Sequence, residues 1–351
     1  MPSDVSPRHA DRSASRAHSP AQPAPARPRL AYLDITKGIL VVLMVVYHSL
    51  NYTNQYHLAF RYLSFLPSSF ILITGFLLST VYFPRYRDGD RQLTPRLILR
   101  GVRLLILFTL LNVAAQYVRS PVYGKPVGIM AFADNWETIY LFGGGLIAAF
   151  EVLLPIAYLL LLAPALIAIA SRRKWFLPVL AAGLVTGCSI LDYRGESLVN
   201  LSFLSIGVVG MLVGRLCPDL SGLGRYLWVT LPIYVAYFPV GVAFGSLFIV
   251  QVTGALAGLA LICVTSVRMG AAGWCQQRLI RLGQYSLVAY IVQIAILQGL
   301  SRIMGRPDPI SAGSLSLFLI TLVSMSLIIE MTEWCRRRST GIDRAYKSIF
   351  A

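Results

Sequence analysis

The stretch LAYLDITKGILVVLMVVYHSLNYTNQY, residues 30–56, determines how the rest of the chain is interpreted. Its apolar residues predict a membrane-spanning helix over residues 33–53. The same stretch contains the ionisable residues Asp34, Lys37 and His48. Ionisable side chains are costly inside a bilayer, so three of them on one helix predict a functional site.

The spacing of these residues places them on one side of the helix. Lys37 and His48 are eleven positions apart, which is roughly three helical turns and about 16 Å along the axis. Asp34 falls within about 40° of the same line. The alternatives are structural: Lys37 extends to the lipid headgroups or pairs with Asp34, and His48 hydrogen-bonds to a neighbouring helix. As a functional group, an imidazole is suited to general-base chemistry near neutral pH.

The composition excludes a soluble globular domain. Hydrophobic residues make up 56% of the chain and charged residues only 13%, which predicts an all-α, polytopic bundle of transmembrane helices. The net charge is +16, but most basic residues flank hydrophobic segments. Membrane topology and anionic lipid therefore explain the charge better than nucleic acid does. The five cysteines include no CxxC pair, so we expect neither a metal site nor a disulfide framework.

Hydropathy and turn residues predict about ten spans with both termini in the cytoplasm, because the basic loops alternate with mixed or acidic ones. We expect a disordered cytoplasmic tail over residues 1–29, a transmembrane domain over 30–338 and a basic cytoplasmic tail over 339–351. The predicted spans are 33–53, 62–83, 97–118, 148–170, 175–191, 197–217, 226–244, 247–267, 282–301 and 314–334.

Three arginines mark the start of the third predicted span. Arg96, Arg100 and Arg103 follow one another at about one-turn spacing. Guanidinium groups bind phosphate through paired hydrogen bonds, so such a cluster suits a phosphorylated ligand. The alternative is the preference of basic residues for the cytoplasmic end of a span. That preference explains Arg96 well, but it explains Arg103 poorly because apolar residues follow it immediately.

Two later spans carry further candidates. Glu151 stands near the outer end of the fourth span, where it could orient an imidazole, take part in proton transfer or neutralise an arginine. Ser286, Tyr290 and Gln293 share one face of the ninth span by their spacing. They could line a polar cavity, although hydrogen bonding between helices explains them equally well.

At these residues the chain is similar to the acyltransferase 3 family of integral membrane O-acyltransferases, which modify sugars and envelope glycans. The family begins with an Arg, a Leu-Asp pair, a basic residue and, after ten intervening positions, a His. The matching residues here are Arg29, Leu33-Asp34, Lys37 and His48.

Three later elements extend the resemblance. The family's Phe-rich second helix ends in Ser-Gly-Phe, matched here by Thr74-Gly75-Phe76, and its Arg-x-x-Arg element is matched by Arg100 and Arg103. The family's late Gly-x-x-Ser…Tyr…His pattern is matched by Gly283, Ser286 and Tyr290. Two positions differ: Gln293 stands where many members have His, and Pro155 replaces the Tyr that usually follows the acidic residue.

The resemblance implies an enzyme that takes a short acyl group from cytoplasmic acyl-coenzyme A to a hydroxyl of an exported sugar, glycan or glycolipid at the plasma membrane. It implies that Lys37, Arg96, Arg100 and Arg103 hold the coenzyme phosphates and that His48 and Glu151 are catalytic. Asp34, Thr74 and Tyr290 would support them, without a metal. A transporter or flippase with a charged substrate path remains an alternative, as does a transmembrane N-acetyltransferase.

Overall fold

A computed structural model of the chain describes most of the residues from Ala31 onward. The predicted tail over residues 1–29, and Arg29 with it, lies outside the described residues. The described ranges are 31–53, 59, 62–118, 128–143, 149–196, 198–308 and 311–350, without the side chains of Ser221 and Phe350.

Every regular element among the described residues is a helix, and ten helical segments there are long and apolar enough to cross a membrane. This confirms the predicted all-α, ten-span architecture, while the orientation of the termini stays a prediction. In chain order the elements are α1 (Ala31–Asn51), η1 (Leu63–Phe65), α3 (Leu66–Leu77), η2 (Leu78–Tyr82), α4 (Phe83–Arg87), α5 (Leu93–Val118), α6 (Ile129–Asp134), η4 (Thr138–Phe142), α7 (Leu153–Arg172), α8 (Phe176–Tyr193), α9 (Val199–Leu216), η5 (Ser221–Tyr226), α10 (Leu227–Phe244), α11 (Phe248–Met269), α12 (Trp274–Gln284), α13 (Ser286–Met304), α14 (Ala312–Arg338) and α15 (Thr340–Phe350).

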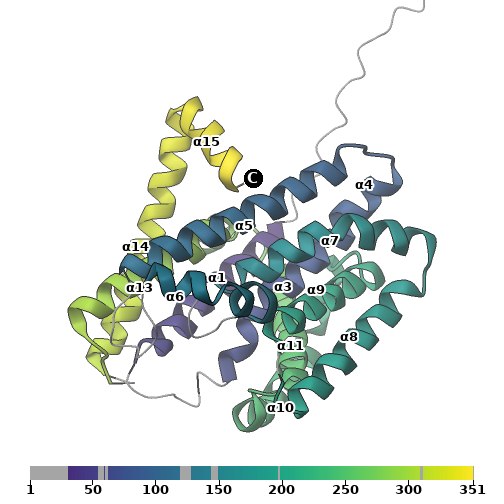
Figure 1. Ribbon diagram of the computed structural model, residues 1–351, viewed down its shortest axis with the longest axis horizontal. Coiled ribbons are helices and arrows are strands. Elements are labelled where there is room, and N and C mark those ends of the chain that lie inside the picture. The colour runs from purple at the N-terminus through teal and green to yellow at the C-terminus, as the bar shows by residue number, and fades with distance from the viewer. Residues whose placement is uncertain are drawn as a thin grey trace, which may run out of the picture. The chain divides into compact units, whose positions relative to one another are not determined.

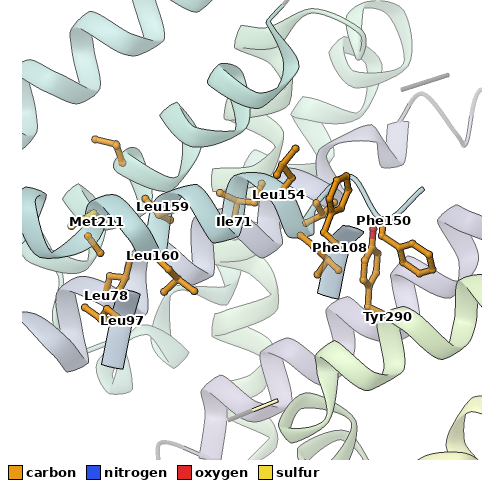
Figure 2. Packing of buried hydrophobic residues seen from close by; sticks show 14 of the residues in the cluster. Ile71, Leu78, Leu97, Phe108, Phe150, Leu154, Leu159, Leu160, Met211 and Tyr290 are labelled. Carbon is orange, nitrogen blue, oxygen red and sulfur yellow. The ribbon is translucent and has the colours of Figure 1, made fainter. Parts of the chain in front are cut away.

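The most buried spans of the bundle are α1, α9, α11 and the segment that contains α3. Small residues allow two of these helices to meet backbone to backbone. A Cβ atom on Gly75 of α3 would lie 1.9 Å from the carbonyl oxygen of Gly207 on α9, so a larger residue cannot occupy this position. The Thr-Gly-Phe element in the second span therefore has a packing role through its glycine. Figure 2 shows the apolar cluster that follows from this packing, from Leu78 and Leu97 at one end to Phe150 and Tyr290 at the other.

The ninth predicted span begins later than expected. The sequence predicted a helix over residues 282–301, but α12 ends at Gln284 and α13 begins at Ser286. The break falls at Tyr285, whose ring is buried and whose hydroxyl donates to Glu333. Residues 282–284 therefore belong to α12, whose residues lie mostly along the N-terminal part of α1 rather than across the membrane.

The basic C-terminal segment also forms a helix. In Figure 1, α15 turns back beside the end of α14. Arg336 of α14 donates to Asp343 of α15 at 3.0 and 2.7 Å, and its guanidinium lies over the ring of Tyr346, 4.0 Å from the centroid. An ion pair and a cation–π contact thus hold α15 against the last span.

Candidate active site

A cavity of about 410 Å³ opens where several helix ends converge. It is lined by the end of α1, the beginnings of η1 and α3, the turn before α7, the end of α8, the start of α9 and the start of α11, together with one face of α13. Because Lys37 lies near the beginning of α1, the cavity lies at the opposite end of that helix. Three residues that the sequence singled out in three different spans line it together: His48, Glu151 and Tyr290.

His48 contributes an imidazole with a buried, unsatisfied nitrogen. Its Nε2 atom makes no hydrogen bond to any residue that the structure describes. The ring packs against Tyr47 and Tyr290, with centroid separations of 5.3 and 6.0 Å. A buried polar atom without a partner costs free energy, so such an atom in a cavity wall is a candidate for binding substrate.

Glu151 enters the cavity from an irregular turn rather than from a helix. The preceding residue, Phe150, has a φ of 60°, a left-handed conformation that is rare for a residue with a side chain. Its ring is buried and lies edge-on to Tyr290, 6.0 Å between centroids, as Figure 2 shows. Backbone strain of this kind is often found at functional sites, and here it lies beside both Tyr290 and Glu151.

The cavity has further polar residues that the sequence reasoning missed. They include Asn51, Ser64, Asp192, Ser202, Ser246, Gln251 and Gln298. Asp192 accepts a hydrogen bond of 2.9 Å from the backbone N–H of Phe248, and so satisfies the first turn of α11. The sequence shows that these polar residues lie in or beside apolar spans, but it does not show which of them line the same cavity. Gln293 is buried but is not a lining residue, whereas Ile294 and Gln298 are.

Lys37 and Asp34 form the ion pair that the sequence analysis gave as one alternative. Lys37 Nζ lies 2.7 Å from the carboxylate of Asp34, which also accepts a 3.4 Å hydrogen bond from Gln284 of α12. The α1 and α12 backbones are in close contact here. A Cβ on Gly283 would lie 1.9 Å from the carbonyl oxygen of Asp34. The pair therefore connects the beginning of α1 to α12.

The three arginines of α5 differ in their surroundings. Arg96 is exposed, donates to Gln92 and lies 4.0 Å from the carboxylate of Asp90. Arg100 is exposed and donates to the hydroxyl of Tyr82. Arg103 is half-buried and makes no hydrogen bond or ion pair within the described part of the chain. Since α5 packs mainly on α7 and α1 mainly on α12, these arginines and Lys37 belong to different helix pairs.

Thr74 lies away from the cavity. Its hydroxyl donates to the carbonyl of Phe70 in its own helix at 2.8 Å. The close contact at this position comes from Gly75, so the element supports the α3–α9 interface rather than the wall around His48. The glycine run at residues 143–145 lies partly outside the described residues; Gly143 follows η4 with a φ of 95°.

Comparison with known proteins identifies the family. A family model described as an acyltransferase domain matches residues 30–329, which covers most of the chain and includes His48, Glu151 and Tyr290. The search of curated proteins and the search of solved structures returned no match. Together with the ten apolar helices, this match makes the chain a multi-pass membrane protein and an acyltransferase of a class that does not transfer aminoacyl groups. The chain belongs to the acyltransferase 3 family.

Proposed function

We propose that the protein transfers an acetyl or other short acyl group from cytoplasmic acyl-coenzyme A to a hydroxyl of an exported sugar, glycan or glycolipid, in the plasma membrane. The observation that carries this proposal is the buried Nε2 of His48, which makes no hydrogen bond to a described residue, in the wall of a cavity that Glu151 also lines. A transferred proton needs a base within hydrogen-bonding reach, and this imidazole nitrogen belongs to a residue that lines the cavity.

The lining suits a polyhydroxylated acceptor. The cavity that Tyr290 lines is also lined by two serines and two glutamines: Ser64, Ser202, Gln251 and Gln298. Short polar side chains offer both donors and acceptors to sugar hydroxyls, and an aromatic ring offers an apolar face. This combination supports a sugar acceptor over a purely apolar one.

The reaction that His48 supports is a single displacement. Nε2 accepts the proton of the acceptor hydroxyl while the hydroxyl oxygen attacks the thioester carbonyl. A carbon–oxygen bond forms, the carbon–sulfur bond breaks, and the coenzyme leaves as a thiolate that takes up the proton from His48. Glu151, which lines the same cavity, would orient the acceptor or the imidazole.

For the donor, the basic side chains toward the start of α1 and α5 support a phosphate site. Arg103 is the strongest candidate, since its half-buried guanidinium has no protein partner within the described residues. Two spans separate the start of α1 from the start of α5, so Lys37, Arg96 and Arg100 would face the same side of the membrane and add positive charge. The phosphates and the thioester would then lie toward opposite ends of α1, which is the separation that a pantetheine arm requires.

The experiment is acyl transfer by purified protein in liposomes, with acetyl-coenzyme A labelled in the acetyl group and alkyl glucosides as acceptors. We expect labelled ester with wild-type protein and background levels with His48→Ala. Ester formation at equal rates by both would disprove the catalytic role of His48. Movement of the glucoside without acylation would favour a transporter, and product formed only with amino sugars would favour N-acyl transfer.

A further inference from the structure

The turn that carries Glu151 is held by a buried side chain on another helix. Asn112 of α5 is completely buried. Its Oδ1 accepts the backbone N–H of Ala149 at 2.6 Å, and its Nδ2 donates to the carbonyl of Ala149 at 2.9 Å. The same Nδ2 donates to Phe108 in its own helix at 3.0 Å. One carboxamide thus satisfies both backbone groups of a residue that has no helix to do so.

Ala149 is the residue before the strained position. Phe150 has the left-handed φ of 60°, and its carbonyl then accepts from Leu153 at 3.0 Å, which begins α7. A residue with a side chain rarely adopts this left-handed conformation, so its surroundings must impose it. The hydrogen bonds from Asn112 fix the backbone of Ala149, immediately before Phe150. The ring of Phe150 itself packs against Tyr290.

We infer that Asn112 is a positioning residue for the acyltransfer site: it fixes the turn at Ala149 and Phe150 so that Glu151 lines the cavity that His48 also lines. Its effect on the rate rests on the proposed function, but its effect on the backbone does not. Asn112 ends the apolar run LLILFTLLN, residues 104–112, which is otherwise explained as part of a membrane span. A carboxamide buried in such a span needs a hydrogen-bonding partner, and the backbone of Ala149 is that partner.

A second buried asparagine provides a matched control. Asn200 of α9 donates to the carbonyls of Ile139 and Tyr140 at 3.2 and 3.0 Å. It therefore also binds backbone carbonyls of a distant segment, in this case the short helix η4 before Gly143. Replacing it removes a buried carboxamide of the same kind without touching the backbone groups of Ala149.

The first measurement is hydrogen exchange of the full-length protein in detergent, followed by mass spectrometry of peptides that cover Ala149. We expect Asn112→Ala to speed exchange at Ala149 by about tenfold or more, because the N–H loses its acceptor. Asn200→Ala should leave that exchange unchanged. Unchanged exchange in Asn112→Ala, with thermal unfolding showing a folded protein, would overturn the inference even if no acyl transfer were ever detected.

The second measurement separates positioning from general stability. We expect Asn112→Ala to lower kcat by about 10- to 100-fold and to change the donor KM by less than about twofold. Added to Glu151→Gln, it should cost little more, because both changes act on the same group. Losses that multiply in the double variant, or an unchanged kcat in the single one, would show that Asn112 does not act through Glu151. Should Asn112→Ala fail to fold, Asn112→Ser keeps a hydroxyl at this position and is tested in the same way.

Discussion

The two ends of α1 treat their ionisable side chains in opposite ways. At the beginning of the helix, Lys37 and Asp34 form an ion pair at 2.7 Å, and Gln284 connects the pair to α12. At the other end, the Nε2 atom of His48 is buried without a hydrogen bond to a described residue. An unsatisfied buried polar atom costs about 1–3 kcal/mol, whereas a paired one holds the fold together. The difference supports the proposal that the chemistry takes place at the His48 end, and it gives the Lys37 end a structural contact.

The largest expected effect is at His48. His48→Gln keeps a polar side chain of similar size but removes the proton acceptor, so we expect kcat to fall by about 10²- to 10⁴-fold. The measurement is steady-state acyl transfer in liposomes. Ser49→Ala is the control on the same helix, because the Ser49 hydroxyl donates only to its own helix at 2.7 Å. A His48→Gln variant with wild-type kcat would show that His48 is not the general base, and the proposed difference between the two ends of α1 would be wrong.

The second prediction concerns Arg103, the proposed phosphate-binding residue of α5. We expect Arg103→Ala to raise the KM for the acyl-coenzyme A by about 10- to 100-fold, because charge-assisted hydrogen bonds to phosphate are lost. Arg96→Ala should raise it less, since Arg96 is exposed and bound to Gln92. The measurement is the KM for acyl-coenzyme A in each variant. Equal values for wild type and Arg103→Ala would show that Arg103 is not part of the donor site.

Gly283 tests the structural role of the Lys37 end. A side chain here would meet the carbonyl oxygen of Asp34, so Gly283→Leu should lower the free energy of unfolding by about 1–3 kcal/mol. Thermal unfolding in detergent measures the change. Gly299→Leu is the matched control, because a Cβ on Gly299 has no neighbour within 4 Å among the described residues. Equal unfolding temperatures for the two variants would contradict the close contact of α1 with α12.

The smallest effect concerns the ion pairs that hold α15. Hydrogen bonds from Lys347 and Arg336 lower the pKa of Asp343 below its usual value. The stability that this shift contributes is present above the usual aspartate pKa of about 4 and is lost as the pH falls through the lowered pKa. The carboxylate is exposed to solvent, so we expect only a modest loosening of α15 in acid.

This loosening can be followed through the mobility of a nitroxide label at Ser348→Cys, after the exposed native cysteines are replaced by serine. We expect greater mobility in acid than at pH 7, and Asp343→Asn should show the acid value already at pH 7. Identical spectra at both pH values would mean that apolar and cation–π contacts, not this ion pair, hold α15 to α14.

Much of the fold followed from local patterns. Hydropathy predicted ten spans that the structure confirms, and the beginning of α1 falls within two residues of the predicted start. The predicted starts of the fourth and ninth spans came too early: α7 begins at Leu153 rather than 148, and α13 begins at Ser286 rather than 282, after a break at Tyr285, whose hydroxyl donates to Glu333 in another helix. A hydropathy pattern reports how apolar a segment is, but not which distant residue interrupts it.

The sequence by itself determined that the chain is a membrane bundle and that His48 is an unusual residue in its first span, because both depend on the cost of placing each side chain in lipid. Only the tertiary structure decided that Glu151 and Tyr290 share a cavity with His48, that Lys37 is paired, and that Asn112 holds the turn before Glu151. These facts depend on where helix ends converge, and that convergence is set by packing between segments far apart in the chain.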